Sequence, residues 1–301
     1  MTKVKGLIDV IGEDKVLFDE PMKNHISFKV GGNADAVVQP SNEEELSKVL
    51  KYVKENDIPY YIMGNGSNII VGDKGFRGVI IKIFSRMCHI EVIGDTMDIK
   101  AGALMGVIGQ KALENSLTGF EFGAGIPGTF GGAVCMNAGA YDGEMKDILL
   151  SVRVMTSDGE IKELDAKDLD LSYRHSIIQD TDYIVLSGKI KLKKGNYDDI
   201  KAKMSEFSAS RREKQPLNYP SAGSTFKRPE GNFAGKLISD AGLKGYSVNG
   251  AEVSEKHAGF VINKDNAKAE DVLEVIKHCQ KEVYEKFGVK LETEVKIIGE
   301  F

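Results

Sequence analysis

The segment 123–141 constrains the fold of this chain most, because six of its nineteen residues are glycine and four are alanine. Glycine loses more backbone entropy on folding than any other residue, so such a segment is expected to turn sharply or to lie directly against another group. A flexible linker is the alternative, but linkers of this kind are polar and rich in serine. This segment instead carries Ile126, Pro127, Phe130, Val134 and Met136. The composition therefore favours a main-chain surface that packs against a bound cofactor.

Length and charge are those of an ordinary globular enzyme. A chain of 301 residues exceeds the usual size of one hydrophobic core, so two or three domains are expected. The net charge of −5, without a basic block, argues against nucleic-acid binding. No apolar stretch approaches the length of a membrane span, and charges interrupt the apolar residues of segment 1–15. We therefore expect no signal peptide, no membrane association and a cytoplasmic location.

The three cysteines, Cys88, Cys135 and Cys279, lie far apart and lack CxxC spacing. This pattern indicates neither a disulfide framework nor a zinc site, and no metal site is predicted elsewhere. Reduced, mostly buried thiols are expected.

The clearest local pattern is a helix over 43–56, with Ser41 and Glu44 as a candidate capping box. Predicted strands at 34–39 and 58–63 flank it, which is the layout of a βαβ unit with parallel strands. Further strands are predicted at 78–83, 89–100, 151–156, 183–191, 259–262 and 289–298, and further helices at 104–115, 197–214, 233–241 and 267–287. We place domain boundaries after residues 85 and 200, giving segments 1–85, 86–200 and 201–301.

Three segments are candidates for binding phosphate or a nucleotide. Gly64-Asn65-Gly66-Ser67-Asn68 follows a predicted strand, where small residues can direct main-chain N–H groups at an anion, although an ordinary turn explains it equally well. Gly123-x-Gly125-x-x-Gly128 matches the dinucleotide fingerprint, but Pro127 inside it and the Gly/Ala run after it argue against a Rossmann turn. The third segment, 24–35, contains Gly31-Gly32.

With further strings in this order, the chain resembles the UDP-N-acetylenolpyruvoylglucosamine reductase family. The resemblance spans most of the chain, and six short strings in order make it specific. They are SFKVGGxAD at 27–35, GNGSN at 64–68, GIPGTFGGA at 125–133 with NAGAY after it, YRHS at 173–176, AGSTFK at 222–227 and LETEV at 291–295. The spacing between Arg174 and Ser224 is similar to that of the shorter type II subgroup.

The resemblance implies an α+β fold, with a two-subdomain FAD-binding region of the vanillyl-alcohol oxidase (PCMH) type and a C-terminal α/β substrate-binding domain. It implies NADPH-dependent, ping-pong reduction of the enolpyruvyl ether of UDP-N-acetylglucosamine enolpyruvate to UDP-N-acetylmuramate, for peptidoglycan synthesis. FAD is expected to be noncovalent, and protein partners are not predicted. The implied cofactor contacts are Gly64, Asn65, Gly66, Ser67, Asn68, Gly123, Gly125, Ile126, Pro127, Gly128, Gly131, Gly132 and Ala133.

Three residues match the catalytic positions of the family. Arg174 offers a guanidinium fork for the substrate carboxylate and enolate, although residue type alone favours a surface arginine. Ser224 is the implied proton donor, whose pattern alone suggests a hydroxyl in a turn. Glu294 is implied to stabilise the intermediate, although alternation over 289–297 alone indicates a solvated strand residue, and Glu292 is two positions away.

Substrate contacts carried over by resemblance are Tyr173, Lys214, Lys227, Arg228 and His257. Lys214 is equally well explained as a cation at a helix end, and His257 as a partly buried histidine. Two residues depart from the family pattern: Ile26 replaces a threonine near the flavin, and Arg228 replaces an asparagine that follows F-K. A flavin oxidase acting on another substrate, and a catalytically silent nucleotide-binding regulator, are the alternative functions.

Overall fold

The computed structural model describes residues 2–301 and divides into two compact units. Unit 1 comprises Met1–Phe18, Ala36–Asn65 and Gly78–Arg211, and unit 2 comprises Asp19–Asp35, Gly66–Arg77 and Arg212–Phe301. Each unit is therefore assembled from segments that are distant in the chain. The division into 1–85, 86–200 and 201–301 stays a prediction.

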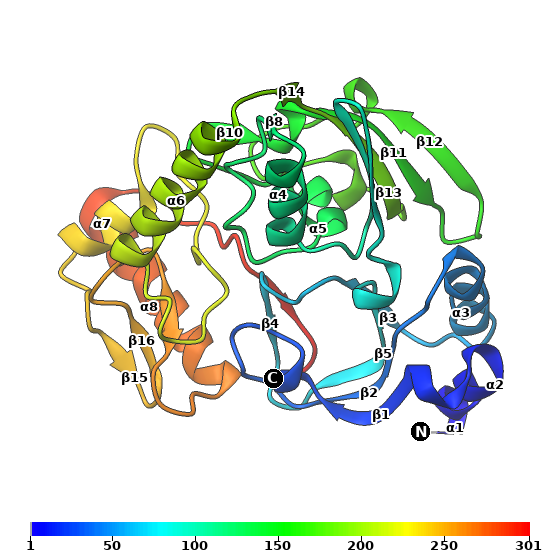
Figure 1. Ribbon diagram of the computed structural model, residues 1–301. Coiled ribbons are helices and arrows are strands. Elements are labelled where there is room, and N and C mark those ends of the chain that lie inside the picture. Colours follow the sequence, from blue (N-terminus) through cyan, green and yellow to red (C-terminus); the bar gives the residue numbers. More distant parts are fainter. Residues whose placement is uncertain (1) are drawn as a thin grey trace. The chain divides into compact units, whose positions relative to one another are not determined.

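The N-terminal part of the chain forms a four-stranded sheet whose order is β1-β2-β5-β3 (Figure 1). Its elements are α1 (Thr2–Lys5), α2 (Leu7–Ile11), β1 (Val16–Pro21), β2 (Asn33–Val38), α3 (Glu43–Glu55), β3 (Tyr60–Met63) and β5 (Phe76–Lys82). The helix and both strands of the predicted βαβ unit are confirmed, but β5 lies between β2 and β3 and pairs with β3 in parallel.

Asn42, not Ser41, caps α3. The Asn42 side chain accepts the main-chain N–H of Glu45 at 2.9 Å, and the Glu45 carboxylate accepts the N–H of Ser41 at 2.8 Å. The predicted capping box of Ser41 and Glu44 is therefore wrong by one position, because asparagine and serine are both good caps and the sequence does not say which one flanks the helix.

A second sheet in unit 1 has five antiparallel strands in the order β12-β11-β13-β7-β6. They are β6 (Ile90–Ile93), β7 (Thr96–Lys100), β11 (Leu149–Met155), β12 (Ile161–Asp165) and β13 (Ile184–Lys191). The predicted single strand 89–100 is thus a hairpin, because Gly94 adopts a left-handed φ of 66° and turns the chain.

Helices and short strands complete unit 1, apart from residues 212–214 at the end of the last helix, which belong to unit 2. They are α4 (Met105–Glu114), α5 (Phe130–Cys135), α6 (Tyr197–Lys214), and the pairs β8 (Leu117–Thr118) with β14 (Lys193–Lys194) and β9 (Gly139–Ala140) with β10 (Gly143–Glu144). The predicted helices 104–115 and 197–214 are confirmed. Short 3₁₀ turns lie at Glu13–Lys15, Met22–Asn24, Ser85–Met87, Met145–Asp147, Ala166–Asp168 and Ile177–Gln179.

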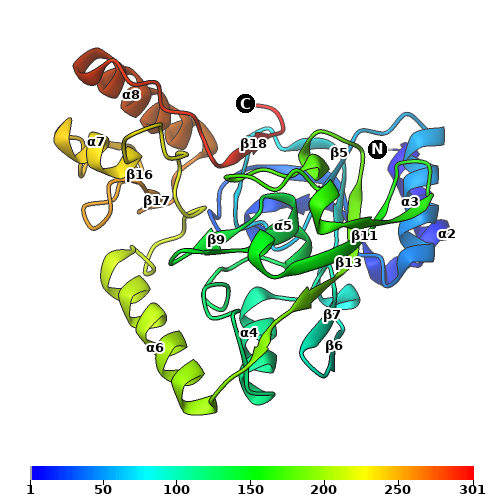
Figure 2. The ribbon, with the colours of Figure 1, turned by 90° about the horizontal axis from the view of Figure 1, so that it is seen from above.

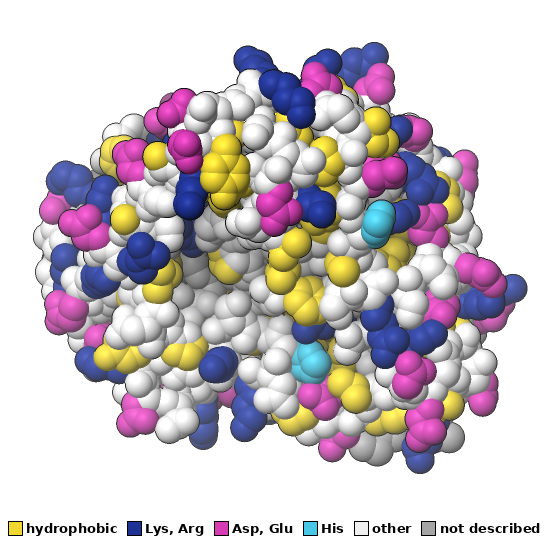
Figure 3. All heavy atoms as spheres, in the orientation of Figure 1, with side chains coloured by type: hydrophobic (Ala, Val, Ile, Leu, Met, Phe, Trp, Pro, Cys, Tyr) yellow, Lys and Arg dark blue, Asp and Glu magenta, His cyan; other side chains and the backbone are white. Residues whose placement is uncertain are grey.

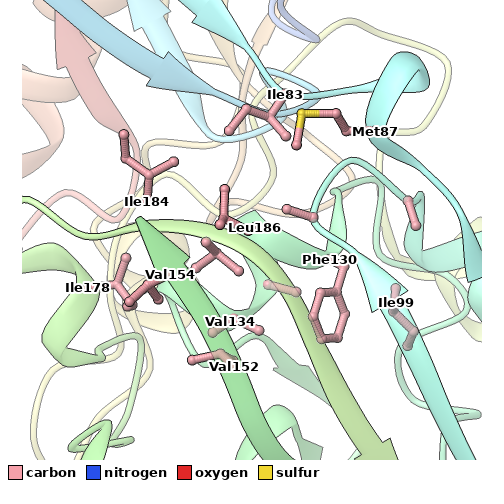
Figure 4. Packing of buried hydrophobic residues seen from close by; sticks show 14 of the residues in the cluster. Ile83, Met87, Ile99, Phe130, Val134, Val152, Val154, Ile178, Ile184 and Leu186 are labelled. Atoms are coloured by element: carbon pink, nitrogen blue, oxygen red, sulfur yellow. The ribbon is translucent and has the colours of Figure 1, made fainter. Parts of the chain in front are cut away.

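The glycine-rich segment contributes to the core of unit 1 through α5, which packs on β13 (Figures 2 and 4). Phe130 is fully buried, and a Cβ added at Gly188 of β13 would lie 2.9 Å from its ring. The surrounding side chains come from α5, the second sheet, two 3₁₀ turns and the end of β5: Ile83, Met87, Ile99, Val134, Val152, Val154, Ile178, Ile184 and Leu186. This packing holds the segment 123–141 against a rigid sheet.

Unit 2 contains a small antiparallel sheet, β15 (Ser247–Val248), β16 (Ala251–Val253) and β17 (Val261–Asn263), with α8 (Ala269–Phe287) packed on it. Asp73 accepts the N–H groups of Ala269 and Glu270, both at 2.9 Å, and so caps α8 from a distant loop. The other elements are α7 (Ala234–Asp240) and the parallel pair β4 (Ile69–Val71) and β18 (Lys296–Ile298). The predicted helices 233–241 and 267–287 are confirmed.

The predicted strand 289–298 is mostly wrong, because only Lys296–Ile298 is a strand. Residues before it instead make an isolated bridge between Thr293 and Phe226. The cysteine prediction also needs correction, because Cys88 is exposed, Cys135 is half-buried and only Cys279 is buried. Burial raises the pKa of the Cys279 thiol to about 12.

Charged side chains of both signs are interspersed over the face drawn in Figure 3. Within residues 2–301, no helix has both the length and the apolar character that crossing a bilayer would require.

Candidate active site

Two predicted cofactor loops contact each other in unit 1. The Asn65 amide donates to the carbonyl oxygen of Pro127 at 2.7 Å, which joins the turn after β3 to the glycine-rich segment. A Cβ added at Gly64 would overlap the Thr129 hydroxyl oxygen. Only glycine therefore allows this close approach of the two loops.

Several main-chain N–H groups of these loops have no acceptor among the described residues. Phe130 and Gly131 donate inward, to the carbonyl oxygens of Ala103 and Ala101, both at 2.8 Å. In contrast, no acceptor within residues 2–301 is found for the main-chain N–H groups of Asn65, Gly128, Thr129 and Gly132. Several N–H donors without a protein acceptor on adjoining loops, with an exposed glycine at Gly132, fit an anionic group such as a dinucleotide diphosphate. The residues present therefore fit FAD.

Other predicted cofactor residues of the segment face protein atoms. A Cβ added at Gly123 would lie 2.9 Å from the Phe120 ring, and one at Gly131 would lie 3.0 Å from Ala101. Ala133 is buried, and Ile126 packs against the core. These four residues shape the loop from within, and their direct contact with a cofactor stays a prediction.

Arg211 is a residue that sequence reasoning missed. A Cβ added at Gly125 would lie 2.9 Å from the Arg211 side chain, so this arginine packs along the glycine-rich loop. Burial lowers the pKa of its guanidinium, although arginine stays charged in proteins. Lys214, the cation predicted from the same R-R-E-K string, is exposed at the end of α6. The contact of Arg211 with Gly125 has no signature in the sequence.

Arg174 is held in a strained loop of unit 1. Its φ is 55°, in the left-handed region, and its guanidinium donates to the Gly139 carbonyl at 3.3 Å. The guanidinium also lies 5.1 Å from the ring centre of the exposed Tyr173, and Gln179 donates to the Arg174 carbonyl at 2.9 Å. Non-glycine residues with such a φ are concentrated at functional sites. Arg174 and Tyr173 thus lie beside β9, at the end of the glycine-rich segment.

In unit 2, the other two predicted catalytic residues lie on paired segments. The main-chain N–H of Glu294 donates to the carbonyl of Thr225, the residue after Ser224, at 2.8 Å. Phe226 and Thr293 form the antiparallel bridge beside this bond, and the Lys227 N–H donates to the Glu292 carbonyl at 2.9 Å. Ser224 is exposed, and within residues 2–301 its hydroxyl makes no hydrogen bond.

The remaining part of the GNGSN loop supports Glu294. The Asn68 amide donates to the Glu294 carbonyl at 3.1 Å, and the Lys296 N–H donates to the Asn68 carbonyl at 3.0 Å. Gly66 has a φ of 65°, and an added Cβ would overlap the His25 carbonyl oxygen. Ser67 is half-buried. The Asn68 side chain therefore positions Glu294, which the sequence did not indicate, while its contact with the cofactor stays a prediction.

The predicted substrate contacts of unit 2 have structural partners. Lys227 pairs with Glu292 at 3.3 Å, and the Arg228 guanidinium lies 4.3 Å from the Phe233 ring centre. The His257 ring accepts the Gly259 N–H at Nδ1, 3.1 Å away.

Burial lowers the pKa of His257, so this side chain is neutral near pH 7. With Nδ1 as the acceptor, the proton of the neutral ring is on Nε2.

Comparisons with known proteins match two separate ranges of the chain. Residues 34–165 match the family model described as FAD binding domain, and residues 215–298 match the model described as UDP-N-acetylenolpyruvoylglucosamine reductase, C-terminal domain. The UDP-N-acetylenolpyruvoylglucosamine reductase of Clostridioides difficile (strain 630) is 52% identical over 295 residues, which are 98% of this chain and 97% of that protein. The protein of the same name from Caldanaerobacter subterraneus subsp. tengcongensis is 51% identical over 99% of this chain and 98% of its own.

Solved structures agree with the predicted fold class. The reductase of the same name from Thermus caldophilus has a TM-score of 0.80 and 34% identity, and the match covers 94% of this chain and 98% of that one. p-Cresol methylhydroxylase matches with a TM-score of 0.51 and 16% identity over 97% of this chain and 65% of its own, which shows a shared fold alone. The predicted α+β fold, with its FAD-binding region of the vanillyl-alcohol oxidase type, is confirmed.

Proposed function

Because the chain belongs to the UDP-N-acetylenolpyruvoylglucosamine reductase family, we propose that it uses NADPH to reduce the enolpyruvyl ether of UDP-N-acetylglucosamine enolpyruvate. The chain is an oxidoreductase with an FAD-binding domain, of a family that forms UDP-N-acetylmuramate in peptidoglycan synthesis. The reductant, the order of steps and the residue roles are the finer parts of the proposal. A cytoplasmic location stays a prediction.

In unit 1, Gly64, Asn65 and the loop 125–132 would hold the cofactor. Their N–H groups that lack a protein acceptor would bind its diphosphate, and Arg211 beside Gly125 adds a fixed positive charge. FAD, when bound, supplies the hydride for the substrate double bond. The chain's own residues must therefore bind the carboxylate, stabilise the negative charge that develops on it and deliver a proton.

Arg174 is proposed to bind the substrate carboxylate. Reduction of an enol ether conjugated to a carboxylate produces an enolate-like charge, and a guanidinium can hold two oxygens of that group at once. The Gly139 carbonyl and the Gln179 bond support the loop that carries it.

Ser224 is proposed to donate the proton, and Glu294 to stabilise the intermediate. The single observation that carries this assignment is the Glu294 N–H bond to the carbonyl of Thr225, because it holds the main chain of Glu294 beside that of Ser224. A serine hydroxyl is a weak acid in water, so a developing carbanion and nearby cations such as Lys227 must ease its deprotonation. The exposed Ser224 hydroxyl is accessible to a substrate.

The order of binding is proposed to be ping-pong, with NADP leaving before the enolpyruvyl substrate binds. Purified protein incubated with NADPH and UDP-N-acetylglucosamine enolpyruvate should form a product that carries two added hydrogen atoms, detected by mass spectrometry. NADPH consumption that depends on oxygen and not on the sugar nucleotide would identify a flavin oxidase instead. A purified protein without flavin absorbance would contradict both assignments.

A further inference from the structure

Thr129 lies between the two cofactor loops of unit 1 and is almost completely buried, with 2% of its surface exposed. It precedes α5, yet its side chain makes no hydrogen bond to the first turn of that helix. Its main-chain carbonyl accepts the N–H of Ala133 at 2.9 Å, so the backbone is fixed while the hydroxyl is left unused by the fold.

The hydroxyl of Thr129 has no hydrogen-bond partner within residues 2–301. Throughout that range, every completely buried polar atom of a side chain does have a partner. The hydroxyl oxygen of Thr129 must therefore lie at the small part of the residue that stays accessible. A nearly buried hydroxyl without a protein partner is unfavourable relative to a valine of the same shape, and a bound acceptor would remove that penalty.

Two glycines of the cofactor loops, Gly64 and Gly132, lie beside the hydroxyl. A Cβ added at Gly64 would overlap the hydroxyl oxygen, and one added at Gly132 would lie 3.6 Å from it. The N–H groups of Asn65, Gly128 and Gly132, which have no acceptor within residues 2–301, belong to the same two loops. All of these groups donate, so the acceptor that satisfies them together is a group with several anionic oxygens.

We propose that the Thr129 hydroxyl donates a hydrogen bond to a diphosphate oxygen of bound FAD and positions the cofactor between the loops. The proposal rests on FAD as the cofactor but on no particular substrate. Binding measurements on FAD alone therefore test it independently of the reductase assignment.

The experiment compares Thr129→Val, which removes the hydroxyl and keeps the shape, with Thr129→Ser, which keeps the hydroxyl. Thr156→Val is the matched control, because Thr156 is buried in unit 1 and its hydroxyl accepts the Glu160 N–H within the protein. For each apoprotein, the dissociation constant of FAD is measured from flavin fluorescence. For each holoprotein, the visible spectrum and the midpoint reduction potential are recorded.

Thr129→Val should raise the FAD dissociation constant about 10- to 100-fold, the range for a hydrogen bond to a charged group. Thr129→Ser and Thr156→Val should stay within about 3-fold of the parent, and the spectrum and potential should not change. An unchanged dissociation constant in Thr129→Val would overturn the proposal. A shifted potential or spectrum would also overturn it, because the hydroxyl would then contact the isoalloxazine ring. If Thr129→Val does not fold, Thr129→Ser decides. Loss of tight FAD binding in Thr129→Ser would show that the methyl group matters and the hydroxyl does not.

Discussion

The main-chain N–H of Glu294 donates a 2.8 Å hydrogen bond to the carbonyl of Thr225, the residue that follows Ser224. The two residues are far apart in the sequence, and the bond fixes the register of two short segments that contain the proposed proton donor and the proposed acidic partner. The Asn68 amide holds the same Glu294 main chain from its other side, at 3.1 Å. The segments that contain Asn68, Thr225 and Glu294 thus together fix one proposed catalytic position in unit 2.

Ser224→Ala should retain FAD and should still be bleached by NADPH, but its reoxidation by the enolpyruvyl substrate should slow by about 10²- to 10⁴-fold, the usual contribution of a positioned general acid. Stopped-flow absorbance of the flavin separates the two half-reactions. Ser247→Ala, at an exposed position of β15, is the control and should react normally. Normal reoxidation of Ser224→Ala would remove this serine from the mechanism.

Glu294→Gln should slow the same half-reaction by about 10²- to 10³-fold, because an amide lacks the acidic proton that a carboxylic acid offers to the developing negative charge. Glu292→Gln is the matched control two positions away. Glu292 is exposed, and among the ion pairs of residues 2–301 it pairs only with Lys227. The turnover of Glu292→Gln should therefore stay within about 3-fold of that of the parent. If Glu292→Gln slows reoxidation and Glu294→Gln does not, Glu292 is the residue that stabilises the intermediate.

Arg174→Lys should lower kcat/KM for the enolpyruvyl substrate by about 10- to 100-fold, because lysine keeps the charge but loses the two-pronged donor geometry. Steady-state kinetics at several substrate concentrations measure this change. Arg86→Lys is the control, because Arg86 is an exposed arginine of unit 1 that pairs with Asp14 at 3.1 Å. Equal kinetics for the Arg174 variant and the parent would assign this arginine to structure alone.

The carboxyl group of Glu43 leads to a prediction of how folding stability depends on pH. Burial raises the pKa of its carboxyl, but hydrogen bonds from Lys100 and Arg153 outweigh burial, so that the net pKa lies below its usual range. A lowered folded pKa contributes stability above the unfolded pKa of about 4.3, and this stability is lost as the pH falls through the folded pKa.

Glu43→Gln should therefore lower the free energy of unfolding by about 1 kcal/mol at pH 7, and the difference from the parent should shrink below about pH 4. Urea titrations at both pH values measure it. Glu44→Gln, at an exposed position with an i,i+4 partner in Lys48, should change stability less. A difference that is independent of pH would exclude the ionised carboxylate as its cause.

Local patterns predicted much of the fold. The apolar stripe of α3 and the long α8 follow from helical periodicity, and both helices were predicted within two residues of their ends. The alternation over 289–298 failed because its residues pair with 225–227 as single hydrogen bonds and not as a regular ladder. An alternating sequence pattern indicates which residues share one face of a strand. It does not indicate how many hydrogen-bond partners the main chain finds.

The candidate site was predicted from family strings more than from residue chemistry. A glycine-rich segment suggests a close approach, but the sequence does not show that Gly123 packs on Phe120 while Gly132 leaves room beside Thr129. Nor does it show that Arg211 packs along Gly125 while Lys214 is exposed. These distinctions depend on tertiary contacts between distant segments, which no local pattern contains.

The measurement that tests the central claim most directly is an anaerobic titration of the purified protein followed by flavin absorbance. Addition of NADPH should bleach the flavin, and subsequent addition of UDP-N-acetylglucosamine enolpyruvate should restore its absorbance with formation of UDP-N-acetylmuramate in equal amount. Flavin that stays bleached after the sugar nucleotide is added, and recovers only when oxygen is admitted, would contradict the account.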